Sequence, residues 1–225
     1  MRYLLVVAHP DDEVLGAGAT VHKLVNEGHE VAICIMANHA AARKNLSDTL
    51  AVDEKRALDV LGIKKVYQAD FPNIKMNIIP HLELVQFIES AIEDFGAEVI
   101  ITHHPSDTNN DHVMTSGAAQ AAARLFQRRE GIPALKRFMY MEILSSTEWS
   151  IDTSANRFTP NYFVEIGQEG VEIKLKALAE YKGVMRPYPH PRSNEAIKSL
   201  AAYRGAQVGR NYAEAFECVF FVDSE

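Results

Sequence analysis

An imidazole and three carboxylates follow one another closely in the stretch AHPDDE, which contains His9, Asp11, Asp12 and Glu13. Two adjacent carboxylates repel each other unless a cation lies between them, and a divalent metal ion would be such a cation. Helix capping is the alternative interpretation, because Asp and Glu in the first turn of any helix complement its dipole. Capping explains one or two of the acids but does not explain His9. The stretch therefore indicates a metal site.

A second cluster of polar side chains occurs far downstream, in THHPSDTNNDH. Its members are His103, His104, Asp107, Asn109, Asp111 and His112. Two imidazoles and one carboxylate are a known ligand set for catalytic zinc, with the fourth position left to water. Such a site generates a hydroxide nucleophile near neutral pH and polarises a carbonyl oxygen. Hydrolysis of a carbonyl compound is therefore the chemistry to consider if the fold brings the two clusters together.

The first cluster lies between a predicted strand and a predicted helix. The apolar run 3–7 predicts a strand that is buried on both faces, as in the middle of a parallel sheet. Pro10 disfavours helical geometry at His9, so the strand ends there and the chain turns. Helical spacing of apolar residues begins at Val14. The cluster is thus expected at the carboxyl edge of a sheet, where open α/β folds bind their ligands.

The rest of the chain continues this alternation of strands and helices. Further strands are predicted at 30–36, 65–69, 98–102, 136–143, 162–166 and 216–223, and helices at 47–61 (with Ser47 as N-cap), 82–95, 113–129, 172–182 and 193–205. The pattern predicts an α/β fold of the Rossmann-like, doubly wound type, with a mainly parallel sheet and helices on both faces. Since no repeat or low-complexity linker occurs, residues 1–225 are predicted to form a single domain.

The predicted topology brings the two clusters together. In a doubly wound sheet ordered 3-2-1-4-5, the first and fourth strands are neighbours and a crevice lies between their carboxyl ends. The loop that holds His112 is then expected to face the loop that holds His9 and Asp12. A dinucleotide-binding Rossmann protein is excluded, because it needs glycines in the first turn and this turn carries anionic side chains that would repel phosphates.

AHPDDE, followed far downstream by an Asp-His pair, resembles the PIG-L / LmbE-like family of zinc-dependent de-N-acetylases. The likeness extends along nearly the whole chain, through LGI, THHPSDTNNDH, SSTEW, PHPRS and YAEAF. It implies an LmbE-like deacetylase domain with one zinc ion per chain, or another divalent metal, bound by His9, Asp12 and His112. It also implies that Asp11 is the general base.

The resemblance further implies a zinc-dependent hydrolase that removes an N-acetyl group from an amino sugar or sugar conjugate of the N-acetylglucosamine type. Two alternatives stay open. One is a metal-dependent hydratase that adds water to an unsaturated acid at the same site. The other is a non-catalytic metal- or sugar-binding protein, although three ligands beside a free carboxylate favour catalysis over a closed structural site.

The second cluster departs from the family pattern at one position. Many members carry His-Pro-Asp-His, whose first histidine is thought to stabilise the oxyanion, where this chain has Asn109 in the sequence NNDH. Asn109 can donate a hydrogen bond to substrate but cannot carry a positive charge. Either zinc acts alone, or another residue supplies the contact. His190 is the candidate, because the prolines of PYPHPRS restrict its backbone; a surface loop histidine is the alternative.

Five further residues are assigned supporting roles. Arg192 is predicted to bind substrate, because a guanidinium suits bidentate contacts with hydroxyl or phosphate groups. Asp107 and Asp111 are predicted to orient the histidines. Arg56 is a candidate substrate contact, with a solvated helix face shared with Glu54 as the alternative. Trp149 is predicted to stack on a sugar or, alternatively, to pack beneath its loop.

Composition restricts the partners of the protein. A net charge of −7 over 225 residues argues against a general nucleic-acid binder, which would need a basic face. The apolar stretch near the N-terminus is too short and has the wrong flanking residues for a signal peptide, and no apolar run approaches membrane-spanning length. We expect a cytoplasmic protein that acts on a small acetylated sugar or conjugate and does not insert into membranes. The family resemblance makes a homo-oligomer a reasonable expectation.

Overall fold

A computed structural model describes residues 1–37, 49–151 and 157–223 of the chain. The strands in these residues are β1 (Arg2–Val7), β2 (Glu30–Ala37), β3 (Lys65–Phe71), β4 (Val99–His103), β5 (Arg137–Met141), β6 (Tyr162–Glu165) and β7 (Ala213–Phe221). The α-helices are α1 (Asp12–Asn26), α2 (Leu50–Leu61), α3 (His81–Phe95), α4 (Asn110–Ala122), α5 (Gly167–Glu180) and α6 (Asn194–Gln207). Short 3-10 turns are η1 (Met76–Ile78), η2 (Leu125–Gln127) and η3 (Thr147–Trp149).

All seven of these strands form one sheet in the order β3-β2-β1-β4-β5-β7-β6. The first five pair in parallel, and β7 pairs antiparallel with both β5 and β6. In the register of β1 and β4, Tyr3 lies opposite Val99 and Val6 lies opposite Thr102. The predicted doubly wound, mainly parallel α/β fold is therefore confirmed, including the neighbouring positions of the first and fourth strands.

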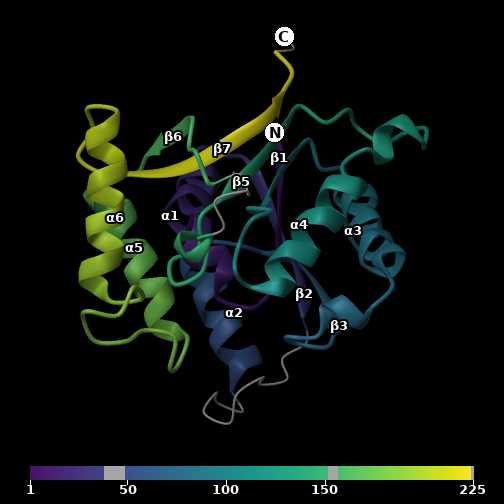
Figure 1. Cartoon of the computed structure of the whole chain (residues 1–225). Helices are drawn as coiled ribbons and strands as arrows, with labels where there is room; N and C mark the ends of the chain where they lie inside the picture. The colour runs from purple at the N-terminus through teal and green to yellow at the C-terminus, as the bar shows by residue number, and fades with distance from the viewer. Residues whose placement is uncertain (38–48, 152–156, 224–225) are drawn as a thin grey trace.

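Helices cover both faces of the sheet (Figure 1). Alternate residues of β1 enter opposite cores: Leu5 and Val7 pack on the side of α1, α2, α5 and α6, whereas Leu4 and Val6 pack on the side of α3 and α4. These β1 residues are completely buried, which explains why the strand is apolar throughout rather than alternating. None of the described helices is long and apolar enough to cross a bilayer.

The structure corrects the prediction at His112. This residue lies in the first turn of α4 and not in a loop, because α4 begins at Asn110, three residues before the predicted start. The side chain of Asn109 accepts a hydrogen bond from the backbone N–H of Asp111 and so caps the added turn. The predicted helix also ends early: α4 stops at Ala122 and the 3-10 turn η2 follows. The predicted N-cap Ser47 lies outside the described residues.

Two helical glycines are expected to respond in opposite ways to an added methyl group. In α6, a Cβ on Gly205 would lie 2.6 Å from the backbone oxygen of Arg210 and 2.8 Å from the backbone nitrogen of Tyr212. In α4, a Cβ on Gly117 would make an ordinary 3.6 Å contact with His81. Gly205→Ala is expected to destabilise the protein by about 1–3 kcal/mol through overpacking. Gly117→Ala is expected to stabilise it by about 0.5–1 kcal/mol, because alanine is the better helix former.

Thermal unfolding of both variants checks this prediction, with a shift of about 2–4 °C expected for each kcal/mol in a chain of this size. An unchanged or raised melting temperature for Gly205→Ala would contradict the close approach of α6 to residues 210–212.

Candidate metal centre and active site

The first cluster is shaped by a tight turn between β1 and α1. The carboxylate of Asp12 accepts the backbone N–H of His9 at 2.9 Å, which closes the turn. Asp11 has φ 107°, a left-handed conformation that is unfavourable for a residue with a side chain. Its backbone N–H donates to Oε2 of Glu13 at 3.0 Å. The turn thus holds a strained Asp11 directly beside Asp12, at the carboxyl edge of the sheet.

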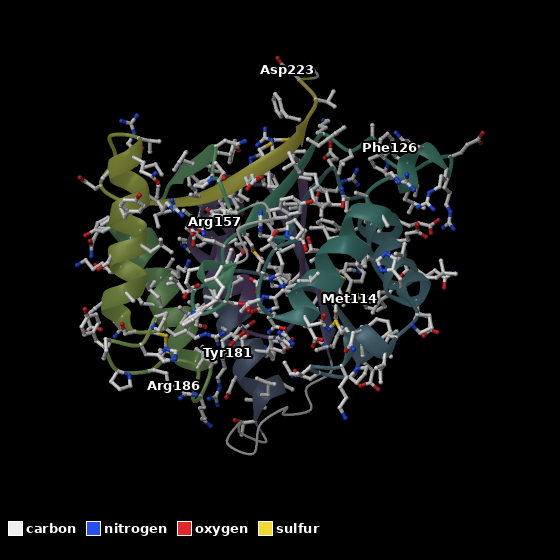
Figure 2. The ribbon with its side chains drawn as sticks, in the orientation of Figure 1. Met114, Phe126, Arg157, Tyr181, Arg186 and Asp223 are labelled. Atoms are coloured by element: carbon white, nitrogen blue, oxygen red, sulfur yellow. The ribbon has the colours of Figure 1, made fainter. Side chains whose placement is uncertain are left out.

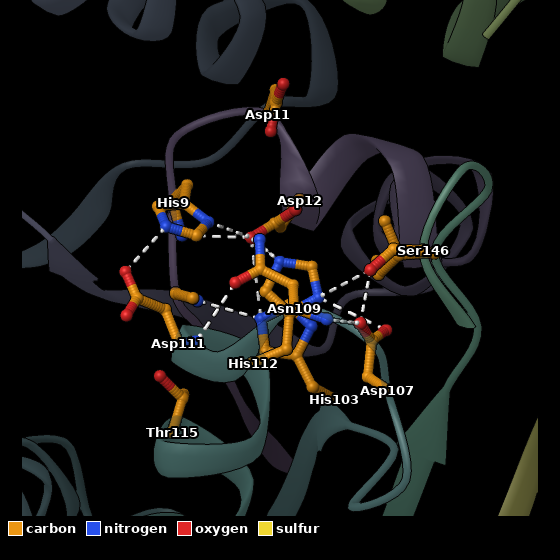
Figure 3. Close-up of polar contacts among 12 residues, drawn as sticks. His9, Asp11, Asp12, His103, Asp107, Asn109, Asp111, His112, Thr115 and Ser146 are labelled. Carbon is orange, nitrogen blue, oxygen red and sulfur yellow. Dashed lines mark hydrogen bonds and ion pairs between the residues drawn. The ribbon is translucent and has the colours of Figure 1, made fainter. Parts of the chain in front are cut away.

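Two histidines and one carboxylate converge at this edge (Figure 3). One ligand atom from each of His9, Asp12 and His112 lies within 4.8 Å of the other two. Oδ2 of Asp12 lies 3.2 Å from Nδ1 of His9 and 3.3 Å from Nε2 of His112. The structure therefore brings together the three residues predicted as metal ligands, although they come from opposite ends of a span of about a hundred residues.

These donors fit a zinc ion. Ligands about 2.0–2.2 Å from a tetrahedral zinc lie roughly 3.3–3.6 Å apart, close to the separations between Asp12 and the two imidazoles. The remaining ring nitrogens are each held by a carboxylate: Nε2 of His9 lies 3.1 Å from Asp111, and Nδ1 of His112 lies 3.2 Å from Asp107. Such carboxylate–histidine pairs fix the orientation of metal-binding histidines. Asp107 and Asp111 thus occupy the positions predicted for orienting residues.

The carboxylates give this site a strong preference for positive charge. Burial opposes the charge on His9, but its hydrogen bonds with Asp111 and Asp12 outweigh burial and raise its pKa to about 9. For His112, burial is likewise outweighed by the charge of Asp12 and the hydrogen bond to Asp107, and its pKa rises to about 10. A divalent cation bound here would balance the same negative charge in place of these protons, since metal binding displaces protons from its ligands.

His103 belongs to the cluster but does not act as a fourth ligand. Its Nε2 accepts the backbone N–H of Ala8 at 2.8 Å, so the lone pair of this nitrogen is already used. Its ring stacks on His112 with centroids 3.9 Å apart. Burial and the neighbouring His112 lower the pKa of His103 to about 3, so this imidazole is neutral. The described residues therefore offer three candidate ligands, His9, Asp12 and His112, and a zinc ion held by them would have its fourth position available to water.

Each orienting carboxylate is anchored by further groups. Asp107 accepts hydrogen bonds from the hydroxyl groups of Ser146 and Thr147. Asp111 accepts the backbone N–H groups of Ile74 at 2.6 Å and Met76 at 3.0 Å. No role was predicted for these four residues from the sequence. Ser146 and Thr147 lie in the SSTEW stretch that contributed to the family resemblance, which was the only sequence signal for them.

The carboxyl group of Asp11 is paired with a guanidinium from the late part of the chain. Nη1 of Arg192 lies 3.0 Å from Oδ2 of Asp11, and Nε of Arg192 donates to the hydroxyl of Ser145 at 2.8 Å. Burial raises the pKa of Asp11 to about 6, although the charge of Arg192 lowers it. Arg192 was predicted to bind substrate; the structure places it at the candidate general base.

Glu13 and Tyr181 stabilise the strained turn through hydrogen bonds. Tyr181, labelled in Figure 2, donates its hydroxyl hydrogen to Oε1 of Glu13 at 2.6 Å. The other oxygen of Glu13 accepts the backbone N–H of Asp11. Burial raises the pKa of Tyr181 above its usual range, and the neighbouring charges of Glu13 and Glu54 raise it further. Glu54 is buried, so the solvated helix face suggested for it is wrong.

The remaining predicted site residues lie around these groups. Nδ1 of His190 accepts the backbone N–H of Arg192 at 3.0 Å, and its side chain is partly exposed. Trp149 is 59% exposed, so it does not pack beneath its loop. Arg56 is exposed on α2. Asn109 uses its carbonyl oxygen as the α4 cap, which leaves its amide N–H₂ as the end able to donate. Their contacts with substrate stay predictions.

Known proteins resemble this chain in sequence and fold. Residues 4–123, more than half of the chain, match the family model described as PIG-L: GlcNAc-PI de-N-acetylase. The chain is 24% identical to the diacetylchitobiose deacetylase of Thermococcus kodakarensis, an alignment that covers 97% of this chain and 83% of that protein.

Solved structures share the fold. The conserved protein TT1542 from Thermus thermophilus superimposes with a TM-score of 0.80 at 24% identity, covering 99% of this chain and 96% of that one. GalB, the 4-carboxy-2-hydroxymuconate hydratase from Pseudomonas putida KT2440, superimposes with a TM-score of 0.77 at 20% identity, covering 100% and 99%. At these identities the structural likeness establishes the fold alone.

The orienting carboxylates provide a test of the metal centre. Asp107→Ala and Asp111→Ala are each expected to weaken zinc binding by roughly 10–100-fold, because the histidine that each carboxylate orients loses its partner. Asp59→Ala is the matched control, since Asp59 pairs with Lys55 on the exposed face of α2. Zinc titration against a chromophoric chelator measures the three affinities. Equal affinities for all three variants would show that the carboxylates do not orient metal ligands.

Proposed function

Because this chain belongs to the PIG-L (GlcNAc-PI de-N-acetylase) family, we propose that it is a zinc-dependent hydrolase that removes an N-acetyl group from an amino sugar or sugar conjugate. The observation that carries the proposal is the buried carboxylate of Asp11, which adjoins Asp12 in the chain and is near enough to His9, Asp12 and His112, the three-residue ligand set, for their charges to shift its pKa. Three protein ligands, with a further carboxylate that is not one of them, are the arrangement of a catalytic rather than a structural zinc site.

The substrate class is inferred from the relatives. The family model is named for de-N-acetylation of an N-acetylglucosamine conjugate, and the Thermococcus kodakarensis relative is a diacetylchitobiose deacetylase. Both names describe the removal of an acetyl group from the nitrogen of an amino sugar. We therefore assign to this chain a substrate of the N-acetylglucosamine type, either free or carried on a larger molecule.

His9, Asp12 and His112 would hold the zinc ion, which when bound lowers the pKa of water and polarises the amide carbonyl. Asp11 then acts on protons. With a pKa of about 6, its carboxyl group is ionised near neutral pH and can accept a proton from the attacking water. The same group can return that proton to the nitrogen of the leaving amine, so that acetate and a free amino group result.

Arg192 sets the position and charge of this base. Its guanidinium holds Oδ2 of Asp11 and opposes the rise of the Asp11 pKa that burial causes. Without this pairing the buried carboxyl group would bind its proton more tightly and would be a weaker acceptor at neutral pH. Arg192 is also proposed to contact a polar group of the substrate. Trp149 and Arg56 are exposed and are proposed to contact the sugar or its conjugate.

The oxyanion contact is assigned to His190, with Asn109 as the alternative. Partial burial and the charges of Arg186 and Arg192 lower the pKa of His190, so its ring is neutral at pH 7. Because Nδ1 accepts a backbone hydrogen bond, the proton resides on Nε2, which can donate to a developing negative charge. The amide N–H₂ of Asn109 can make a weaker contact of the same kind.

A hydratase remains the second candidate function. GalB shares the fold, and Asn109 stands where many family members have a catalytic histidine, which is compatible with a change of reaction at one metal site. Acetate release from N-acetylglucosamine and diacetylchitobiose, compared with the loss of absorbance of an unsaturated acid, separates the two reactions. A protein that binds zinc or sugar but performs neither reaction would support the non-catalytic alternative.

The role of Asp11 is tested by Asp11→Ala. This variant is expected to retain about one zinc ion per chain but to release acetate about 10²–10⁴-fold more slowly, because the proton acceptor is lost while the ligands remain. Metal analysis and an acetate assay measure both quantities. As a control, chelation of wild-type protein should abolish turnover and added zinc should restore it. Near-normal turnover in Asp11→Ala or in metal-free protein would refute the mechanism.

The oxyanion assignment is tested by comparing His190→Ala with Asn109→Ala. His190→Ala is expected to lower kcat by about a hundredfold with little change in zinc affinity, because it removes a donor used in the transition state. Asn109→Ala is expected to cost less. A larger loss of kcat in Asn109→Ala would transfer the oxyanion contact to that residue.

A further inference from the structure

Helix α1, whose first residue is the ligand Asp12, is broken after its first turns. Ala17 has φ −144° and ψ 15°, which are not helical values, and it divides α1 into residues 12–16 and 18–26. In a continuous α-helix the N–H of Ala19 would bond the C=O of Leu15. Because Ala17 is completely buried, backbone groups released by the break need partners from within the protein.

A buried ion pair occupies the break. Nζ of Lys174, on α5, donates to the backbone oxygen of Leu15 at 2.8 Å and lies 2.6 Å from Oε1 of Glu214, on β7. The carboxylate of Glu214 accepts the N–H of Ala19 at 3.2 Å and the N–H of Thr20 at 2.7 Å. The pair is therefore inserted where the hydrogen bond between residues 15 and 19 would run.

The charges of the pair match the two helix ends that meet at the break. The ammonium of Lys174 lies at the carbonyl end of the first segment, and the carboxylate of Glu214 lies at the N–H end of the second. Each charge opposes the partial charge of the helix end that it contacts. Lys174 is 7% exposed and Glu214 is 5% exposed, so water does not compete with these bonds. The pair thus stabilises the broken geometry over a straight helix.

The first segment lies against the end of β5. A Cβ on Gly16 would approach Sδ of Met141 to 2.4 Å, so a larger residue here would force the Met141 side chain to shift. The break thus lies between Gly16, which contacts Met141 of β5, and Ala19, which packs in one cluster with Val171 of α5.

We propose that Lys174 and Glu214 are positioning residues of the metal centre: they fix the break in α1 and thereby direct the first turn, with Asp11 and Asp12, toward His9 and His112. This inference rests on the proposed metal site. It assigns a functional role to an ion pair that contacts none of the three ligand side chains.

Zinc affinity measured well below the melting temperature tests the proposal. Lys174→Met and Glu214→Gln are each expected to bind zinc about tenfold more weakly, because the first segment loses its fixed direction. The double variant is expected to melt at a higher temperature than either single variant, since it buries no unpaired charge, yet to keep the weak zinc affinity.

The control for general destabilisation is Ile92→Ala. Ile92 is buried on α3, in the core on the opposite face of the sheet, and its truncation lowers the melting temperature without touching α1. This variant is expected to bind zinc like the wild type. If the double variant binds zinc as tightly as the wild type, or if Ile92→Ala loses equal affinity, the pair serves stability alone and the proposal is wrong.

A second measurement does not require metal or activity. In metal-free protein, amide hydrogen exchange at residues 12–16 is expected to accelerate at least tenfold more in the double variant than exchange at residues 21–26. Uniform acceleration along α1 would overturn the proposal even if a single variant fails to fold. A wild-type protein that binds zinc but releases no acetate would refute the proposed function and leave this inference standing.

Discussion

The carboxylate of Asp12 is a negative charge that is almost completely removed from water. Its surroundings consist of groups that compensate this charge: the backbone N–H of His9 and the imidazoles of His9 and His112. Burial of a charge is tolerated only when partners replace its hydration. The charge of His112 therefore holds the pKa of Asp12 well below its usual range, although burial alone would raise it. Two strands and two helix starts have to meet at one point to provide these partners, and the order of the sheet achieves this.

The groups that surround Asp12 have hydrogen-bonding partners of their own. The histidines around Asp12 are in turn held by Asp107 and Asp111, and these carboxylates are held by hydroxyl and backbone N–H groups. The same logic applies to Asp11, whose buried carboxyl group needs Arg192 and whose strained backbone needs Glu13. A polar network of this kind is favourable only when nearly every member is satisfied. Its rigidity is the property that a catalytic constellation requires, because small displacements of reacting groups are costly.

The amino-acid sequence was sufficient to predict the first five strands, their order and the meeting of the two clusters. The strands follow from the period of apolar residues, which is local in the sequence. Their order follows from topological rules that hold for parallel sheets in general. The antiparallel pairing of β7 with β5 and β6 was not predicted, because a short apolar run does not reveal its direction. The pairing of Arg192 with Asp11 was missed for a related reason. It depends on how a proline-rich loop folds across the edge of the sheet, and an isolated arginine carries no signal of its partner. The burial of Glu54 was likewise invisible, since a glutamate on a helix usually faces water.

The end of the family match at residue 123 divides the chain into two parts with different contributions. All three proposed ligands and both orienting aspartates lie before this point, whereas Ser146, Lys174, Tyr181, Arg192 and Glu214 lie after it. The later part thus holds none of the three proposed ligands, yet several of its described residues contact the turn between β1 and α1 or the residues that support it. A lineage that exchanges this part to acquire a new substrate must also rebuild the supports of Asp11 and α1. Recognition and catalysis in this fold are therefore expected to evolve together, and a shift in specificity would carry a change in reactivity with it.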